Sequence, residues 1–493
     1  MIVDSDLLSM QQARILAENA FCAQKKLAAF SQESLDAIVE HVAACVKPHA
    51  ASLARQCQEE THYGNATDKE AKNLFVCGRA LEALRGMRCV GVVAEDTAKG
   101  TLDVGVPLGV IAALCPATSP VSTALWQVLL AIKSGNAIIF SPHPRAVKTL
   151  RTLFGIIQAA AAERGLPQGC IAYLETVSKS GALELMRHPA ISLIMAASAP
   201  TTLPDVLACG KPVIFGGTGN GPAFIERTAN IPQAVADIVA SKSFDYGMAP
   251  SAEQSVVVEA CIAHEVEHAM QAQGVYFMTE AEAAALAGLL FCNNGGRKPA
   301  AVGVSAQTLA SRAGFLVPQN TKVLAARRAF VSEADPYSRE LLAPVLAYYV
   351  EADWMHACEK CIELLLHEKN GHTLVIHSNS PEVIRQFALK KPVGRMLVNT
   401  PAAFGGMGMT TNLFPSMILG SGSAGRGITA DNVSPLHLTY IRKIGYGVRP
   451  CPGVQPCTCA AAPASSPCLP ASQEQSLEAL RRLLAAALGG TQG

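Results

Sequence analysis

The sequence predicts an α/β protein built on two parallel sheets, and two observations carry this prediction. Short apolar runs alternate with amphipathic stretches from Leu108 onward, and a second alternation starts near Ser255. Strands that crossover helices cover on both faces read as such continuous apolar runs. In addition, 493 residues with a hydrophobic fraction of 50% suffice for the cores of two or three domains.

An N-terminal helical layer precedes the first alternating region. Residues 5–60 carry helical periodicity with scattered charges. The first alternation then predicts strands at 108–115, 136–140, 170–175, 192–197 and 212–217, joined by helices over 121–134, 145–164, 180–187 and 201–208. This order is typical of a doubly wound, Rossmann-like sheet. We expect the first domain to cover residues 1–243.

The second alternating region predicts another α/β domain, over residues 244–410. Its strands are expected at 255–260, 323–327, 345–350, 373–378 and 395–400, with helices from 263 and 279 and over 353–367 and 381–389. A polar turn, FDYGMAPSAEQSVVV, opens this region at residues 244–258. Ligands of open α/β sheets bind in crevices at strand ends, so this turn is the candidate site.

Charge and hydropathy exclude several function classes. The formal net charge is +1, which offers no strong field to attract nucleic acid or an anionic membrane. The apolar runs are shorter than the roughly 18 to 20 residues that span a bilayer. The N-terminus lacks the pattern of a secretory signal, so we expect a cytoplasmic protein. Its 16 cysteines are then expected to be mostly reduced, buried thiols.

The end of the chain differs in composition. Residues 451–475 are rich in Pro, Ala, Ser and Cys without periodicity, which predicts a flexible linker. An amphipathic helix is expected over 476–490, with one apolar face of leucines at 477, 480, 484 and 488. So short a helix gains stability by docking, either on its own protein or, as the long tether favours, on a partner. The tail cysteines are metal or cluster ligands, oxidisable thiols or ordinary linker residues.

Several motifs follow one another in a fixed order: PLGVIAALCPATSPVSTAL, GNAIIFSPHPRA, GKPVIFGGTGNGPAFIE, FDYGMAPSAEQSVVV, SRELLAPVLAYY, GHTLVIHS and NTPAAFGGMG. This order resembles the CoA-acylating aldehyde dehydrogenases, which include the acetaldehyde dehydrogenases of bacterial microcompartments. The resemblance covers roughly residues 5–450. It implies the aldehyde dehydrogenase fold, NAD and coenzyme A as cofactor and co-substrate, and an oligomerisation arm in the return segment 411–450 of a homo-oligomer.

The resemblance also implies site residues. Thr118, Ser119 and His372 match positions of the catalytic site. The cofactor-binding positions correspond to Pro142, His143, Ser198, Ala199, Gly217, Gly219 and Glu340, of which Glu340 matches the carboxylate that holds the nicotinamide ribose. The family forms a thioester on a cysteine thiolate, a strong nucleophile near neutral pH. No metal ligands are expected, because Cys358 and Cys361 beside His356 lie in a helical pattern without a second ligand pair.

The chain departs from the family pattern at two places. Pro250 stands in the column of the nucleophilic cysteine, and a slip of one residue offers only Ala249 or Ser251. Ser198 and Ala199 stand where relatives carry glycines that let the dinucleotide approach the backbone, so we expect an altered cofactor site. Ser251 is a weak substitute nucleophile, and Cys115 near the expected pocket is better explained by core packing.

Two functional hypotheses follow. The first is a catalytically impaired aldehyde dehydrogenase relative with a cargo or structural role, because the linker and terminal helix resemble the encapsulation peptides of bacterial microcompartments. Its partner would be the shell or other cargo. The alternative is an active NAD-dependent enzyme that converts acetaldehyde to acetyl-CoA through a group not identified from the sequence.

Overall fold

The computed structural model describes residues 4–197, 201–292, 296–368, 371–449 and 451–452. Ser198, Ala199, most of the expected linker and the whole expected terminal helix lie outside the described residues. The chain divides into one compact unit of residues 1–95 and 102–444 and a second of residues 96–101 and 445–493. Within the described part of the chain, none of the helices has both the length and the apolar character needed to cross a membrane.

The N-terminal helical layer is confirmed. It consists of α1 (Ser5–Leu27), α2 (Gln32–Val46), α3 (Ala50–Thr61), α4 (Ala66–Phe75) and α5 (Leu81–Leu84), with a π-helical turn over Val76–Ala80 between the last two. Asp4, Ser31 and Asn65 cap the first turns of α1, α2 and α4 with side-chain oxygens, as such residues do at helix starts.

A five-stranded parallel sheet follows this layer, in the order β5-β4-β3-β6-β7. Its strands are β3 (Val110–Leu114), β4 (Ala137–Ser141), β5 (Ile171–Tyr173), β6 (Ile191–Ala197) and β7 (Val213–Gly216). The connecting helices are α6 (Pro120–Lys133), α7 (Val147–Glu163), α8 (Lys179–Arg187) and α9 (Leu203–Leu207). All nine elements lie within a few residues of their expected positions, so the doubly wound sheet is confirmed.

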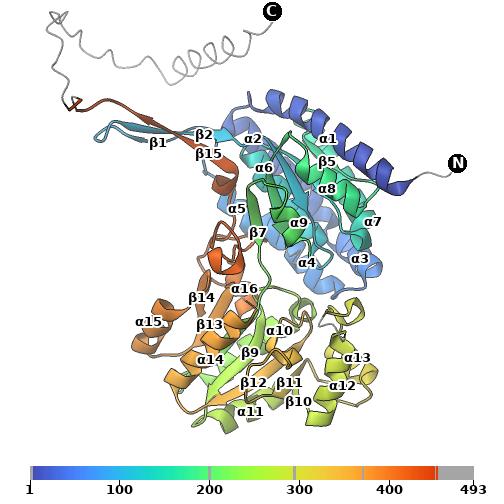
Figure 1. Cartoon of the computed structure of the whole chain (residues 1–493), viewed down its shortest axis with the longest axis vertical. Helices are drawn as coiled ribbons and strands as arrows, with labels where there is room; N and C mark the ends of the chain where they lie inside the picture. The colour runs from blue at the N-terminus through green and yellow to red at the C-terminus, as the bar shows by residue number, and fades with distance from the viewer. Residues whose placement is uncertain (1–3, 198–200, 293–295, 369–370, 450, 453–493) are drawn as a thin grey trace, which may run out of the picture. The chain divides into compact units, whose positions relative to one another are not determined.

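Helices cover this sheet in two groups. α2 packs against α6 and α7, and α3 also packs against α7, whereas α1 packs along α8 (Figure 1). The strand order reverses between β3 and β6, and a right-handed crossover on each side of that point puts α6 and α7 on one face and α8 and α9 on the other. The carboxyl ends of β3 and β6 therefore border the crevice in which such sheets bind ligands.

The second sheet has seven parallel strands in the order β10-β11-β12-β9-β8-β13-β14. They are β8 (Gly221–Ile225), β9 (Glu253–Glu259), β10 (Val275–Phe277), β11 (Val323–Arg327), β12 (Val345–Glu351), β13 (Thr373–His377) and β14 (Arg395–Val398). The helices are α10 (Ile231–Ser243), α11 (Ala263–Ala272), α12 (Glu280–Leu290), α13 (Ala306–Arg312), α14 (Trp354–His367), α15 (Pro381–Lys390) and α16 (Ala402–Gly406).

Alternate residues of one strand fill the two cores of this sheet. Val256 and Val258 of β9 pack with α10 and α11, and Val257 between them packs with residues of α12, α13, α14 and α15. Side chains of a strand point alternately to the two faces, and every residue of β9 is buried. The strand that follows the candidate turn is therefore fixed from both sides.

The boundary between the sheets differs from the expected one at Ser243. Strand β8 and helix α10 precede Ser243, yet β8 pairs with β9 and β13 of the second sheet. The chain thus changes sheets in the glycine-rich segment 217–220. The apolar run of β8 gives no sign of which sheet it joins, because buried strands of both sheets have the same composition.

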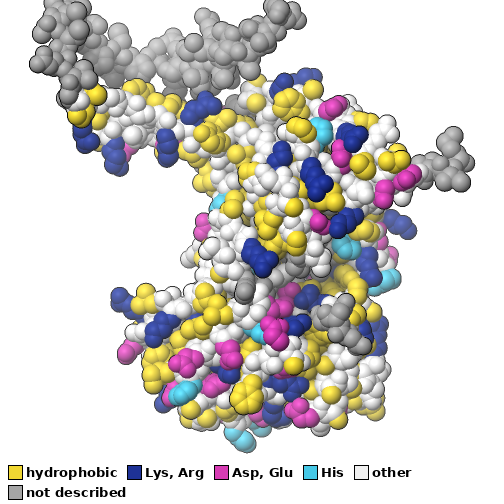
Figure 2. All heavy atoms as spheres, viewed as in Figure 1, with side chains coloured by type: hydrophobic (Ala, Val, Ile, Leu, Met, Phe, Trp, Pro, Cys, Tyr) yellow, Lys and Arg dark blue, Asp and Glu magenta, His cyan; other side chains and the backbone are white. Residues whose placement is uncertain are grey.

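A third sheet has the order β1-β2-β15, with β1 (Gly91–Asp96), β2 (Thr101–Pro107) and β15 (Thr439–Gly445). Only β15 lies in the segment 411–450, for which an arm was expected; β1 and β2 lie outside it and were not predicted from the sequence. In the smaller unit, Tyr446 N–H donates to the carbonyl of Gly100 at 2.9 Å. On the face drawn in Figure 2, basic and acidic side chains are interspersed, in keeping with the net charge of +1.

Candidate active site

The sequence-predicted residues gather at facing ends of the two parallel sheets. Three pairs follow the carboxyl ends of first-sheet strands: Thr118 and Ser119 after β3, Pro142 and His143 after β4, Gly217 and Gly219 after β7. Three residues precede the amino ends of second-sheet strands: Pro250 before β9, Glu340 before β12 and His372 before β13. Ser198 and Ala199 come directly after β6 in the sequence and lie outside the described residues.

Pro250 lies in a tight turn at the entrance of β9. The N–H of Ala252 donates to the carbonyl of Ala249 at 2.9 Å, which makes Pro250 the second residue of a four-residue turn. Proline favours this position because its fixed φ matches the turn. The neighbouring Ser251 is buried, and its hydroxyl donates to the carbonyl of Ala403 at 3.4 Å.

Gly219 lies against the backbone of this turn. A Cβ at this position would stand 1.6 Å from the carbonyl oxygen of Pro250, which no side chain tolerates. The N–H of Gly219 donates to Oε1 of Glu340 at 2.9 Å. Glycine is required here by a close backbone approach, and the contact connects two predicted site residues directly.

Glu340 is a buried carboxylate held in one orientation. Arg297 donates to its Oε2 at 3.1 Å and to its backbone carbonyl at 2.6 Å. Its own N–H donates to Glu368 at 2.8 Å. A carboxylate accepts about four hydrogen bonds in all, so Glu340 retains capacity for a further donor such as a ribose hydroxyl. The ribose-binding role that the resemblance implies for Glu340 stays a prediction.

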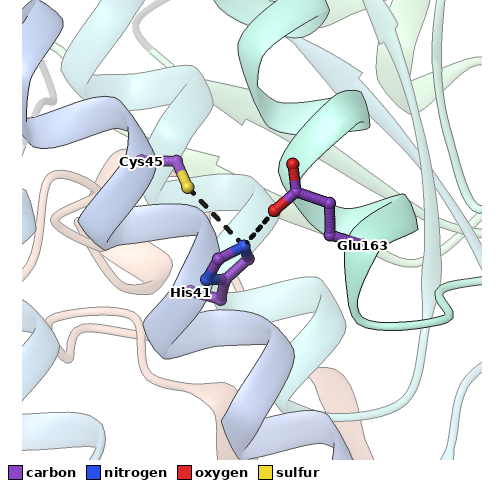
Figure 3. Close-up of side chains that lie close together, drawn as sticks. All are labelled: His41, Cys45 and Glu163. Carbon is purple, nitrogen blue, oxygen red and sulfur yellow. Dashed lines mark hydrogen bonds and ion pairs between the residues drawn. The ribbon is translucent and has the colours of Figure 1, made fainter.

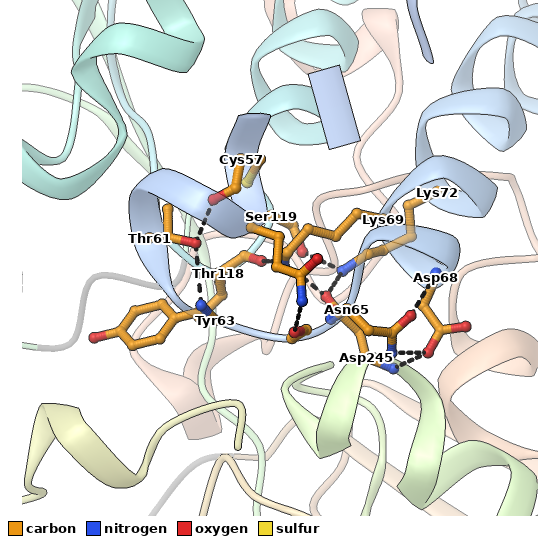
Figure 4. Close-up of polar contacts among 12 residues, drawn as sticks. Cys57, Thr61, Tyr63, Asn65, Asp68, Lys69, Lys72, Thr118, Ser119 and Asp245 are labelled. Carbon is orange, nitrogen blue, oxygen red and sulfur yellow. Dashed lines mark hydrogen bonds and ion pairs between the residues drawn. The ribbon is translucent and has the colours of Figure 1, made fainter. Parts of the chain in front are cut away.

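A buried charge cluster lies beside the turn, five residues before Pro250. Asp245 accepts hydrogen bonds from Lys72 and, at 3.1 Å, from Lys69, and its Oδ1 accepts the N–H of Asn65 at 3.0 Å (Figure 4). All three charged side chains are at most 5% exposed. Burial raises the pKa of Asp245, but the charges of Lys72 and Lys69 outweigh this effect, so its pKa lies below the ordinary value.

Helix α4 presents both lysines of the cluster. Asn65 caps the helix by accepting the N–H of Asp68 at 2.9 Å, and Lys69 and Lys72 are three residues apart, which places them on one face. Asp68 also accepts the backbone N–H of Asp245 at 2.7 Å. Asp245 has φ of 46°, in the left-handed region that aspartate tolerates better than most residues.

The same lysines position two of the predicted site residues. Lys69 Nζ donates to the carbonyl of Thr118 at 2.8 Å, and Lys72 Nζ donates to Oγ of Ser119 at 2.6 Å (Figure 4). Ser119 is the N-cap residue of α6, next to Pro120 in its first turn. The cluster around Asp245 therefore connects the end of β3 in the first sheet to the turn that precedes β9 in the second.

His372 is buried next to Gly217. A Cβ added at Gly217 would lie 3.5 Å from Cδ2 of His372 and 2.7 Å from Cβ of Ser421. Nδ1 of His372 lies 2.8 Å from Thr373 Oγ1, and Arg395 donates to its carbonyl at 3.0 Å. Burial first, and then the charge of Arg395, lower the pKa of His372 well below its ordinary value. It is therefore a neutral imidazole.

Pro142 and His143 lie apart from this group. His143 is exposed, and its Nδ1 accepts the N–H of Arg145 at 3.1 Å within its own turn. Within the described residues, no hydrogen bond joins this pair to the turn around Pro250.

Two further buried ionisable residues, Lys242 and Glu253, precede and follow the turn in the sequence. Burial raises the pKa of Glu253, the first residue of β9, to about 7. Burial also lowers the pKa of Lys242 to about 7, although Glu253 and Glu340 act in the opposite direction. Oε1 of Glu253 accepts the N–H of Ala402 at 2.9 Å, and Lys242 Nζ donates to Gln254 at 3.0 Å. Acidic and basic groups thus surround the turn.

The thiol nearest in sequence to Thr118 is not activated. Cys115 is buried, and its Sγ lies 3.4 Å from the carbonyl of Pro120, to which it donates. Burial raises its pKa above the ordinary cysteine value. Cys361, which the sequence analysis considered as a metal ligand, is buried on α14, and burial raises its pKa to about 12. Both behave as packed thiols, as expected.

Several residues of the site were not predicted. Lys69, Lys72 and Arg297 hold Asp245 and Glu340, and the two lysines could have been noticed as cations three residues apart on an otherwise packed helix. Cys292 was also missed: it is exposed, and its N–H donates to the carbonyl of Gly296 at 2.7 Å. Its neighbour Phe291 forms an isolated β-bridge with Arg297, which contacts Glu340.

A family model and several known proteins are similar to this chain in sequence. The family model described as "Aldehyde dehydrogenase family" matches residues 2–277. The bifunctional aldehyde-alcohol dehydrogenase AdhE of Escherichia coli K12 is 36% identical over 435 residues, which cover 87% of this chain and 49% of the relative. The chain therefore spans about half the length of this relative. Succinate-semialdehyde dehydrogenase (acetylating) of Clostridium kluyveri is 31% identical over 431 residues, covering 87% of this chain and 95% of the relative.

Solved structures show the same fold. A probable aldehyde dehydrogenase from Listeria monocytogenes EGD-e has a TM-score of 0.89 and 44% identity, over 91% of this chain and 99% of that chain. A propionaldehyde dehydrogenase from the fucose utilisation bacterial microcompartment of Clostridium phytofermentans has a TM-score of 0.80 and 28% identity, over 89% of this chain and 97% of that chain. By sequence and by fold, this chain belongs to the aldehyde dehydrogenase family.

Proposed function

We propose that this protein is a relative of the CoA-acylating aldehyde dehydrogenases that is impaired in thioester formation and acts as cargo or as a structural component of a bacterial microcompartment. The observation that carries the proposal is Pro250 in the turn before β9, where the family pattern has a cysteine. The buried charge cluster around Asp245, the anchored carboxylate of Glu340 and the Gly219 contact are all present around this turn.

A proline removes two chemical groups at once. Its ring carries no nucleophile, and its nitrogen carries no hydrogen, so the position can neither attack an aldehyde carbonyl nor donate a backbone N–H to the oxyanion that forms. Ser251 does not replace the thiol, because its hydroxyl donates to the carbonyl of Ala403 and no base is among its hydrogen-bond partners in the described chain. Loss of a catalytic nucleophile reduces kcat by about a millionfold in other enzymes.

NAD binding is part of the family inheritance. The strand-order reversal between β3 and β6 and the anchored carboxylate of Glu340 support dinucleotide binding, although Ser198 and Ala199 depart from the family's glycines; NAD would supply a hydride acceptor when bound. We therefore expect NAD to bind without turnover. Calorimetry with NAD, and separately with coenzyme A, measures binding independently of activity.

A restoration experiment tests the impairment. The purified full chain is assayed with acetaldehyde, NAD and coenzyme A beside Pro250→Cys and Pro250→Ala. We expect less than about one turnover per second for the wild type and Pro250→Ala, below the median rate of enzymes, and a thioester with measurable turnover only for Pro250→Cys. Wild-type turnover at or above that rate would refute the proposal. If NAD binds but Pro250→Cys stays inactive, the impairment extends beyond the nucleophile.

An active NAD-dependent acetaldehyde dehydrogenase is the second candidate, and Cys292 is the observation that favours it. This exposed thiol follows Phe291, which forms a β-bridge with Arg297, and the guanidinium of Arg297 contacts Glu340. If it replaced the missing sulfur, Cys292→Ser would abolish wild-type turnover, whereas Cys22→Ser, which changes another exposed thiol, would not. We expect the wild-type chain to show no turnover, so that neither substitution changes it.

The cargo role is tested through the tail. The sequence pattern of a linker followed by an amphipathic helix over 476–490 supports docking on the shell or on other cargo. Deletion of residues 471–493 is expected to abolish co-purification with shells and to leave the homo-oligomer unchanged in gel filtration. Unchanged packaging would contradict the role. This outcome is independent of the activity assays.

A further inference from the structure

Three potential metal ligands meet on the surface of the helices that cover the first sheet (Figure 3). His41 and Cys45 are four residues apart on α2 and so lie on one face, and Glu163 is the last residue of α7, against which α2 packs. The ligand atoms of the three side chains all lie within 4.8 Å of one another. His41 and Cys45 are partly buried, and Glu163 is exposed.

Both neighbours face the same imidazole nitrogen. Nε2 of His41 lies 2.7 Å from Oε2 of Glu163 and 3.7 Å from Sγ of Cys45. In a catalytic triad the nucleophile and the carboxylate contact different nitrogens of the histidine, so that one nitrogen accepts a proton while the other is held. The dashed lines in Figure 3 instead meet at one nitrogen. A nitrogen, a sulfur and an oxygen that converge on one point resemble a ligand set.

The distance between the histidine nitrogen and the cysteine sulfur matches the one that a zinc ion requires. Zinc bonds of about 2.3 Å to sulfur and about 2.0 to 2.2 Å to nitrogen and oxygen, at tetrahedral angles, put N and S roughly 3.6 Å apart and N and O roughly 3.3 Å apart. The N to S distance is 3.7 Å already. The N to O distance of 2.7 Å has to lengthen by roughly half an ångström, and Glu163 can make this shift because its side chain is 65% exposed at the end of its helix.

We propose that His41, Cys45 and Glu163 bind one divalent transition-metal ion, with Zn²⁺ as the best fit and water in the fourth position. Imidazole, thiolate and carboxylate together favour zinc, whereas Ca²⁺ and Mg²⁺ prefer all-oxygen ligand sets. Binding displaces the thiol proton of Cys45 to the solvent. The ion connects α2 to α7 across 122 residues of sequence, and none of its ligands belongs to the candidate active site.

The experiment uses the full chain with Cys451, Cys457, Cys459 and Cys468 changed to serine, which removes the thiols of the tail as competing ligands. After treatment with a chelator, the protein is titrated with Co²⁺ and then with Zn²⁺ in competition with a chromophoric chelator. We expect one ion per chain, a thiolate-to-cobalt charge-transfer band, and a rise in the melting temperature with Zn²⁺.

Matched variants assign the ligands. Cys45→Ser is expected to remove the charge-transfer band and to weaken Zn²⁺ binding at least tenfold. Even the loss of a residue that only contacts a ligand typically weakens metal binding by about tenfold or more. His41→Ala should weaken binding similarly and Glu163→Gln less, whereas Cys22→Ser in α1 should change nothing. Absence of binding, or a band and affinity that survive Cys45→Ser, overturns the proposal. Far-ultraviolet circular dichroism of each metal-free variant verifies its fold.

Discussion

Two neighbouring parts of one segment, Asp245 and Pro250, differ in what holds them in place. Asp245 is buried between two lysines of another helix, and its backbone and side chain make hydrogen bonds to Asn65 and Asp68. Pro250 is held through the backbone alone, by the turn between Ala249 and Ala252 and by the contact of its carbonyl with Gly219.

The difference separates folding from chemistry within the site. Removal of one partner from a buried ion pair leaves an uncompensated charge and is strongly destabilising. Replacing the side chain at position 250 leaves no buried charge unpaired, because the contacts described for Pro250 involve backbone atoms. A substitution of Asp245 is therefore expected to destabilise the fold, whereas the side chain at position 250 is expected to be exchangeable without unfolding the protein.

The largest effect is expected when the charge cluster is broken. Asp245→Asn keeps the shape of the side chain but leaves Lys69 and Lys72 buried without their anion, so the free energy of unfolding should fall by about 3 to 5 kcal/mol. Urea titration measures it. Asp96→Asn, which removes an exposed partner of Lys99, is the control and should leave the transition unchanged. Equal effects of the two variants would contradict the cluster's importance.

The acid dependence of stability sharpens the same comparison. The folded pKa of Asp245 lies below its ordinary value of about 3.9, so its contribution is complete above that pH and is lost as the pH falls through the folded pKa. The stability difference between wild type and Asp245→Asn should therefore be largest above about pH 4 and shrink in more acidic buffer. A difference that does not change with pH would assign the effect to packing alone.

An intermediate effect is expected at Gly219. Its replacement by alanine forces Cβ against the carbonyl oxygen of Pro250 and should lower the free energy of unfolding by about 1 to 3 kcal/mol. Gly155 in α7 has no atom within 4 Å of an added Cβ, so Gly155→Ala should instead stabilise by up to about 1 kcal/mol. Thermal denaturation of both variants tests the contact. If Gly219→Ala left the free energy of unfolding unchanged, the turn would adapt to the added Cβ at no measurable cost.

The smallest effect is expected at Pro250 itself. Pro250→Ala should lower the free energy of unfolding by less than about 1 kcal/mol, since the substitution mainly adds freedom to the unfolded chain. Urea titration under the same conditions as for Asp245→Asn measures the contrast. A loss as large as that of Asp245→Asn would mean that the ring, and not the backbone, holds the turn.

The sequence predicted the buried strands well because each carries its signal locally. The run VLAAR coincides with β11, and the strands of the first sheet were predicted within two residues of their ends. Strands β1 and β2 were missed because neither is a buried strand with the long apolar run by which the other strands were predicted. The residues of β8 were included in the first domain without a predicted strand, because local composition does not show with which strands a segment pairs.

The site was predictable only where a motif marks it. Pro250, Gly219 and Glu340 came from the resemblance, and the structure brings them into contact. Lys72 and Asp245 are 173 residues apart, and His41 and Glu163 are 122 apart. Such pairs are created by the fold, and one sequence alone gives no measure of their distance.

The contact between Gly219 and Pro250 runs through a carbonyl oxygen, which every amino acid possesses. The backbone conformation of the turn therefore does not depend on which side chain stands at position 250. A lineage that loses its reactive group there still makes a stable protein that can assemble, and catalysis can return as long as the turn is kept.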